Sequence, residues 1–314
     1  MGFFSSLFSS SSNEEDHQQK VDRKNFDILK YDGIRAQRMG KLEYAAQCFT
    51  EALKIQKDFE TMSYLISACY LLNRHDQALE TLNEMVATGK ETANILLMRA
   101  NLLFTMKNYA ETEADCMQVI ELKPDNHLAY FLLAKTKTIL GEPTMSIEYL
   151  DKATGIKPDF AEGHALRAEI NLLMKNGNEA LADIEKVIEL TPEDETAYLL
   201  RARIHELLNN TDAASDDYRQ ALELNPFNEE TYLLAGRLLM TQEKFDEAIA
   251  LLDEAIEHNE NFAKAYAARA FAKYQTGDHE GALADEQSSK ELNPDENVSV
   301  VGNNFDDLYK GNII

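Results

Sequence analysis

The sequence predicts an all-α protein made of tandem helical hairpins, and three regularities carry this prediction. A small side chain returns every 34 residues over most of the chain. A large apolar side chain follows it four positions later in most copies, and an apolar residue follows it seven positions later in all copies but the last. Spacings of three and four residues place such positions on one face of a helix. Prolines end five of the copies, where they prevent the preceding helix from continuing.

The recurring small residue marks the second helix of each repeat. Its column reads Ala45, Ala78, Thr112, Ser146, Ala180, Ala214, Ala248 and Ala282. The apolar column four positions later reads Phe49, Leu82, Cys116, Leu150, Ile184, Tyr218, Leu252 and, in the last repeat, Glu286. The closing prolines are Pro124, Pro158, Pro192, Pro226 and Pro294.

A first helix is predicted upstream of each of these. Its small column reads Gly33, Ile66, Ala100, Ala134, Ala168, Ala202, Gly236 and Ala270. Turn residues separate it from the second helix in several repeats, at Gly40, Gly141, Asn209 and Gly277. Each repeat is therefore expected to be two short helices that meet where side chains are small enough for close approach.

The chain is strongly acidic, with 31 basic and 55 acidic residues and a formal charge of -24. This charge argues against sequence-independent binding of nucleic acid, which needs a basic surface. It is compatible with basic or mixed-charge protein partners, although solubility alone is the simpler explanation. The three scattered cysteines fit no metal-type spacing, which favours a reduced, cytoplasmic protein.

The first 25 residues are expected to form a disordered, serine-rich and acidic leader. No apolar run approaches the roughly 18 residues of a membrane span, and the N-terminus is a poor secretory signal. Two alternatives stay open for it, and both confine membrane contact to residues 1–8. Gly2 and Ser6 match a loose myristoylation pattern. A weak interfacial anchor would use Phe3, Phe4, Leu7 and Phe8.

This pattern resembles the tetratricopeptide repeat family in its period, its contacts between small and large residues, and the proline that follows five of the second helices. The departures are local: there is no tryptophan, and Lys57, Lys90 and Glu260 stand where proline is usual. Residues 295–314 are expected to form a tail or a partial cap. The repeats are expected at 26–58, 59–92, 93–126, 127–160, 161–194, 195–228, 229–262 and 263–294.

Arginine and aspartate recur 16 residues apart in four repeats, and antiparallel helices should bring them together. The pairs are Arg99 with Asp115, Arg167 with Asp183, Arg201 with Asp217 and Arg269 with Asp285. The two positions change together, since Leu133 stands with Tyr149 and Ala235 with Leu251. We expect salt bridges within each repeat, exposed and worth about 0–1 kcal/mol. A ligand-binding role is the less favoured alternative.

No pattern for catalysis or for a cofactor is present. The seven histidines are scattered, and the sequence contains no H-E-x-x-H, P-loop, G-x-S-x-G or calcium-loop motif. The carboxylates follow the repeat register, as solvated helix faces do. We therefore expect a non-enzymatic protein without catalytic residues, a cofactor or a metal.

The resemblance implies a right-handed superhelical α-solenoid whose first helices line a concave groove. Its predicted ligand-binding residues are Asn101, Phe131, Lys135, Leu199, Arg203, Leu233, Arg237, Phe271 and Tyr274, with Phe104, Glu206 and Met240 nearby. Apolar anchors and a few charges suit an extended or helical peptide. The alternative is an internal charge ladder through Lys135, Glu169 and Arg203, with Glu206 satisfying Arg237.

The sequence thus predicts an adaptor or scaffold that binds protein or peptide segments in this groove. Its ligand is expected to carry apolar and acidic residues, nucleic acid is not expected, and homo-oligomerisation stays open. The alternative function is that of a structural assembly factor tethered to a membrane surface by its N-terminal leader.

Overall fold

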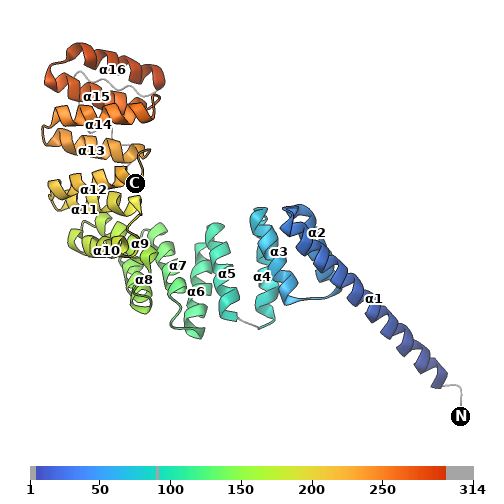
Figure 1. Cartoon of the computed structure of the whole chain (residues 1–314). Helices are drawn as coiled ribbons and strands as arrows, with labels where there is room; N and C mark the ends of the chain where they lie inside the picture. Colours follow the sequence, from blue (N-terminus) through green and yellow to red (C-terminus); the bar gives the residue numbers. More distant parts are fainter. Residues whose placement is uncertain (1–4, 90–91, 295–314) are drawn as a thin grey trace. The chain divides into compact units, whose positions relative to one another are not determined.

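The computed structural model describes residues 5–89 and 92–294 (Figure 1), and these form sixteen α-helices and no strand. The first helices of the hairpins are α1 (Ser5–Arg38), α3 (Phe59–Leu71), α5 (Thr92–Thr105), α7 (His127–Ile139), α9 (Ala161–Leu173), α11 (Glu195–Leu207), α13 (Glu229–Thr241) and α15 (Ala263–Thr276). The second helices are α2 (Leu42–Ile55), α4 (His75–Ala87), α6 (Tyr109–Leu122), α8 (Pro143–Ile156), α10 (Gly177–Leu190), α12 (Thr211–Leu224), α14 (Phe245–His258) and α16 (His279–Leu292).

The array divides into two compact units between Ile156 and Lys157. The N-terminal unit holds α1 to α8, and the C-terminal unit holds α9 to α16. Within each unit every helix packs against the helix before it and the helix after it. The predicted all-α solenoid of helical hairpins is confirmed.

Each hairpin closes through a small residue and a larger one 16 positions later. Phe49 of α2 is fully buried against Gly33 of α1, where an added Cβ would lie 2.6 Å from the Phe49 ring. At Gly236 of α13, an added Cβ would lie 3.6 Å from Leu252 of α14. A side chain at Gly33 would therefore displace Phe49, whereas a Cβ at Gly236 would make an ordinary van der Waals contact.

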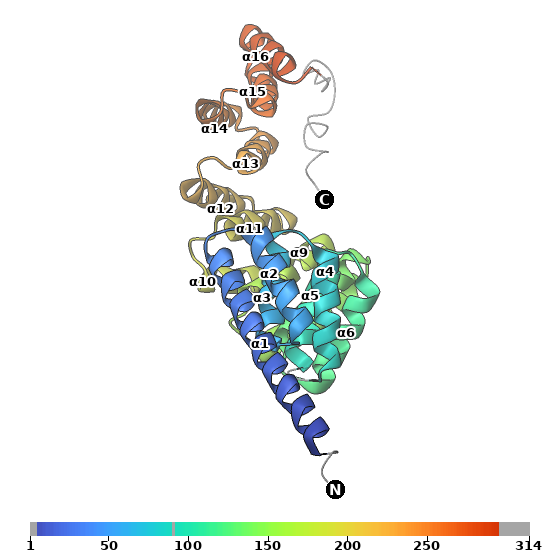
Figure 2. The same cartoon turned by 90° about the vertical axis from the view of Figure 1, so that its right-hand side faces the viewer.

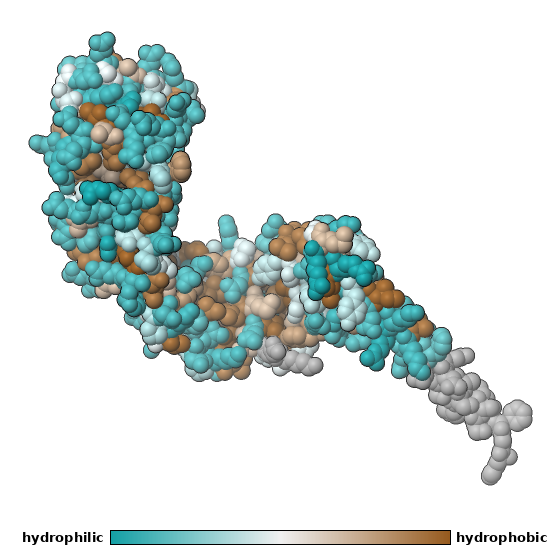
Figure 3. Space-filling model, in the orientation of Figure 1, coloured by the Kyte–Doolittle hydropathy of each residue, from teal (hydrophilic) through white to brown (hydrophobic). Residues whose placement is uncertain are grey.

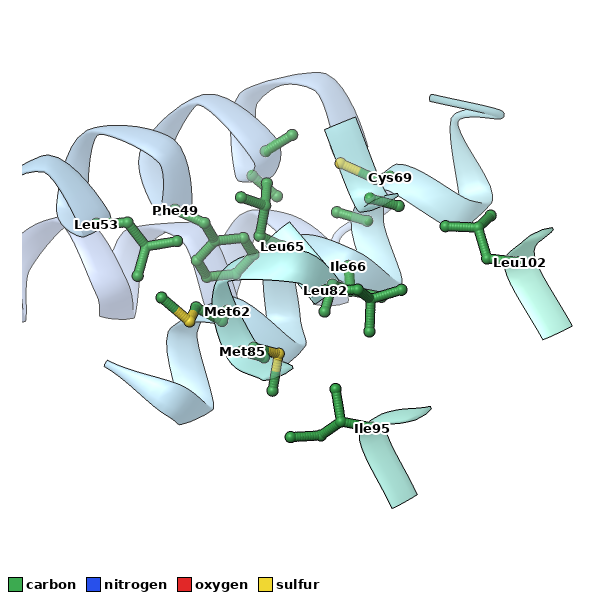
Figure 4. Close-up of a cluster of buried hydrophobic side chains, with 14 of the residues drawn as sticks. Phe49, Leu53, Met62, Leu65, Ile66, Cys69, Leu82, Met85, Ile95 and Leu102 are labelled. Atoms are coloured by element: carbon green, nitrogen blue, oxygen red, sulfur yellow. The ribbon is translucent and has the colours of Figure 1, made fainter. Parts of the chain in front are cut away.

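The apolar columns gather into cores inside the units. Figure 4 shows Phe49, Ile66, Leu82 and Met85 converging from α2, α3 and α4, and each is at most 1% exposed. A second cluster lies in the C-terminal unit around Tyr232, Leu252, Ile256 and Phe262. Burying each side chain of this size stabilises a fold by roughly 1.5–3 kcal/mol. The cores therefore hold the helices together repeat by repeat.

The turn inside each described hairpin has one residue in the left-handed conformation, always at the same position of the repeat. Positive φ angles of 55° to 88° occur at Gly40, Asn73, Lys107, Gly141, Lys175, Asn209, Glu243 and Gly277. The amide after this residue bonds back into the first helix, as from Arg74 to the Cys69 carbonyl at 2.8 Å. Four of these positions were predicted as turns from sequence; the lysines and Glu243 give no such signal because their left-handed conformation is uncommon.

The N-terminal leader differs from the expected disorder. Residues 5–25 belong to α1, a single helix of 34 residues that contains no proline and continues into the first hairpin. Phe26 is the first buried residue among the described side chains of α1. Figures 1 and 2 show the N-terminal part of α1 extending past α2 and α3. Residues 295–314, expected to form a tail or a cap, lie outside the described residues.

All four predicted arginine–aspartate pairs form. Each arginine donates two parallel hydrogen bonds, and the Nη2–Oδ1 distance is 2.6 Å in every pair. The expectation that they are exposed was wrong. The aspartate side chains are 4–8% exposed and the arginines 14–24%, because the aspartate lies next to the buried apolar column. The estimate for exposed pairs therefore does not apply to them.

Two of these arginines also reach back to the preceding hairpin. Arg99 donates to the Asn83 side chain of α4 at 2.8 Å, and Arg269 pairs with Asp253 of α14. Both partners lie 16 residues upstream of the arginine. The arginine therefore joins three consecutive helices, which couples neighbouring repeats.

The last hairpin places polar residues at buried positions. Glu286 and Ser289 of α16 are 8% and 5% exposed. Glu286 holds the position that Leu252 occupies in the preceding repeat, and this position faces the first helix of its own hairpin. Lys290 compensates its charge at 2.6 Å.

Removing one partner of a pair should cost more than removing both. We expect Asp217→Leu to lower the free energy of unfolding by about 2–3 kcal/mol, because it leaves the half-buried Arg201 uncompensated. The double variant Arg201→Ala/Asp217→Leu copies Ala235 and Leu251 and should recover most of this loss. Denaturant unfolding followed by circular dichroism measures both. Equal losses in the single and double variants would contradict the interpretation.

Acid should weaken the last hairpin through Asp285. Burial alone would raise the pKa of Asp285, but hydrogen bonds and charge from Arg269 and Lys273 outweigh it and hold the pKa below its usual value. The stabilisation is therefore complete above about pH 4 and is lost as the pH falls through the lowered value. Hydrogen exchange in α15 and α16 should accelerate relative to the other helices in this range. Asp285→Asn should remove that pH dependence.

Candidate functional site

The predicted ligand-binding residues fall on the first helices of both units, so each unit is described separately. In the N-terminal unit they are Asn101 of α5 and Phe131 and Lys135 of α7. In the C-terminal unit they are Leu199 and Arg203 of α11, Leu233 and Arg237 of α13, and Phe271 and Tyr274 of α15. We call the set in the C-terminal unit, together with Glu169 and Glu206, the first-helix face.

In the N-terminal unit, Lys135 lies between two aromatic rings. Its ammonium nitrogen is 5.0 Å from the ring centre of Phe104 on α5 and 5.8 Å from that of Phe131. Such cation–π contacts hold the lysine in place at a modest gain of free energy. The Asn101 amide donates to the Leu97 carbonyl of its own helix at 2.8 Å. These polar groups therefore already have partners within the unit.

The apolar residues of the first-helix face differ in their access to solvent. Leu199 and Leu233 are 9% and 5% exposed and belong to core clusters, so they support the face from beneath. Phe271 is half-buried, and Tyr274 is 39% exposed, with its ring 4.8 Å from that of His279. The expected apolar floor is thus offered mainly by the two aromatic residues of α15. Sequence reasoning missed this because burial depends on the neighbouring helix.

Arg237 is engaged inside the protein. Its guanidinium donates to Glu206 at 2.7 Å, and the hydroxyl of the buried Tyr218 donates to the same carboxylate. Burial and the adjacent Glu206 raise the pKa of Tyr218 far above its ordinary value. The alternative expectation that Glu206 satisfies Arg237 is confirmed. The tyrosine was missed because its position reads as an ordinary member of the apolar column.

Arg203 differs from the arginines around it. Over the described ranges, no carboxylate forms an ion pair with it, whereas Arg201 and Arg237 are both paired. It interacts electrostatically with Glu169 of α9. Glu169 is exposed as a residue, yet the surrounding chain shields its carboxyl, and this burial raises its pKa while Arg203 opposes the rise. Glu169 and Arg203 therefore interact without forming the ion pair that the expected charge ladder would place between them.

Other chemistry finds no support in the part of the chain that the structure describes. No group of three or more histidine, cysteine or acidic residues there could hold a metal ion. Cys48, Cys69 and Cys116 are buried free thiols, and burial raises the pKa of Cys116 to about 12. None of the described helices is both long enough and apolar enough to cross a membrane.

Comparison with known families identifies the repeats. Profiles of the tetratricopeptide repeat match residues 93–126, 127–160, 167–229 and 211–271. Together with the hairpin geometry, these matches show that the chain belongs to the tetratricopeptide repeat family. Proteins of this family are helical scaffolds for interactions between proteins, and the structure has that architecture.

Solved structures agree on the fold. The chain is similar to PilW, a type IV pilus biogenesis factor, with a TM-score of 0.55 and 17% identity over 66% of this chain and 96% of that one. It is also similar to pilF of Pseudomonas aeruginosa, with a TM-score of 0.54 and 17% identity over 68% and 96%. MamA from Desulfovibrio magneticus gives 0.52 and 14% over 54% and 96%. No curated protein matches the sequence.

Proposed function

We propose that the chain is a non-enzymatic adaptor that binds an acidic protein segment on the first-helix face of its C-terminal unit. The observation that carries the proposal is the contrast between Arg203 and its neighbours. The arginines that hold the fold have carboxylate partners, while Arg203 pairs with none among the described residues. A half-buried guanidinium without a partner suits a carboxylate from a ligand, because such a pair forms strong, charge-assisted hydrogen bonds.

Phe271 and Tyr274 would supply the apolar contacts of the same segment. Both lie on α15, and Tyr274 presents a large aromatic surface to solvent. Aromatic anchors contribute most of the affinity at protein interfaces, and charges fix the register. A segment with an acidic residue and apolar residues therefore fits the C-terminal unit. In the N-terminal unit, the predicted Lys135 instead lies against the rings of Phe104 and Phe131.

Charge reversal at Arg203 should abolish this binding selectively. We would select ligands from a displayed library of random peptides on the wild-type protein, and then compare Arg203→Glu with Arg219→Glu. Arg219 is an exposed arginine of α12 outside the first-helix face, so it controls for the change in net charge. We expect affinity to fall about 10- to 100-fold in Arg203→Glu only, because a charged hydrogen bond is lost. Equal affinities in the two variants would refute the proposal.

The affinity for an acidic peptide should also rise as the pH falls from neutrality towards the raised pKa of Glu169. Burial raises the pKa of Glu169, so its carboxylate takes up a proton above the usual range. Protonation removes a charge that repels the ligand and competes for Arg203, while the ligand carboxylate stays ionised. Titration by fluorescence anisotropy at several pH values measures this. Glu169→Gln should bind tightly throughout, and an unchanged pH profile in that variant would contradict the role of Glu169.

A further inference from the structure

The N-terminal part of α1 has no partner helix among the described residues. From residue 17 to 25, the described side chains are exposed apart from the half-buried Asp22, and α1 packs mainly against α2. At 1.5 Å per residue, its 34 residues span about 51 Å, far more than the 13- and 14-residue helices beside it. A protruding helix gains most of its stability by packing, so this stretch suits a docking element.

Basic residues gather in the part of α1 that follows its acidic residues 14–16. Residues 20–38 carry six basic and three acidic residues, although the whole chain has a formal charge of -24. Arg23 and Lys24 form no ion pair within the described part of the chain. In Figure 3 the described part of α1 shows mainly hydrophilic residues with hydrophobic ones among them. We define the basic face as Lys20, Arg23, Lys24, Ile28, Tyr31 and Arg35, which line a shallow hollow of about 470 Å³ together with Asp27 and Asp32.

Apolar side chains within the basic face favour a protein partner. Tyr31 is 62% exposed and Ile28 49% exposed, although both are large. Aromatic residues surrounded by charge are the usual anchors of protein interfaces. The basic side chains around them would select an acidic surface by charge complementarity.

The same chain carries a surface of the opposite kind on α14. Phe245–His258 contains five carboxylates and no lysine or arginine. We define the acidic face as Asp246, Glu247, Glu254 and Glu257, which are all exposed. Phe227 lies beside it, 72% exposed, with its ring 5.3 Å from that of His258. The acidic face thus also combines charge with an exposed aromatic ring.

We propose that the basic face of α1 docks on the acidic face of α14 in a second copy of the chain. Arg23 and Lys24 meet carboxylates of the acidic face there, and Tyr31 packs near Phe227. The contact joins two different faces. If each of two copies offers both faces to the other, two such contacts close a dimer, whereas a head-to-tail arrangement extends the assembly. Repulsion between two acidic copies is screened beyond about 8 Å at physiological salt. The charge pairs at the contact itself therefore determine whether two copies associate. This surface is separate from the first-helix face.

Mass and charge reversal together test the proposal. Sedimentation analysis of the full chain should give a mass above 35.5 kDa at about 0.15 M salt and 35.5 kDa at about 1 M salt. Arg23→Glu/Lys24→Glu and Glu247→Lys/Glu257→Lys should each be monomeric. Mixing these two double variants should restore association, because each reversed face then meets a complementary one. Lys107→Glu/Lys152→Glu makes the same change in net charge at exposed sites elsewhere and should associate like the wild type.

Three outcomes would overturn the proposal. A wild-type chain that is monomeric at its highest soluble concentration would rule out docking on a second copy. This outcome includes the case in which α1 docks within its own chain. Association that survives both reversals, in variants with wild-type circular dichroism, places the contact elsewhere. A monomer whose binding to phosphatidylserine vesicles is lost on Arg23→Glu/Lys24→Glu would assign the basic face to a membrane surface instead.

Discussion

A residue in the first helix of each hairpin meets the residue 16 positions later, and the other features of the array are arranged around this contact. Gly33 leaves room for the Phe49 ring, and Gly236 lies against Leu252. The neighbouring position follows the same rule, since it places each arginine on its aspartate with a 2.6 Å contact. The apolar contact sets the distance between the two helices, and the ion pair fixes their register.

The same contact explains how the scaffold presents side chains for binding. The small residues of each first helix face the second helix of the same hairpin. The larger side chains of the first helices therefore lie on the faces that point away from that second helix. Most charges there are compensated internally, as Arg237 is by Glu206. Arg203 is the exception that supports the proposed site, and the uncovered end of α1 is the exception that supports self-association. Both proposals rest on groups that the repeat itself does not use.

Sequence periodicity was sufficient to predict the hairpins, because the contact recurs at a fixed spacing and needs a small residue. It was also sufficient for the arginine–aspartate pairs, since both members change together. Burial was not predictable in the same way. The aspartates, Glu286, Leu199 and Leu233 are buried by helices whose approach the residue types do not reveal. That Arg203 forms no ion pair within the described residues likewise required knowledge of which neighbouring charges lie within reach.

Installing a new pair where the chain has none tests the 16-residue contact most directly. Ala235→Arg, Leu251→Asp and the double variant form a double-mutant cycle for the free energy of unfolding. If these two positions face each other, each single change buries an unpaired charge, and the double variant should be more stable than the sum of the singles predicts by about 1–3 kcal/mol. A coupling energy near zero would show that the two positions do not meet and would contradict the account of how the repeats are built.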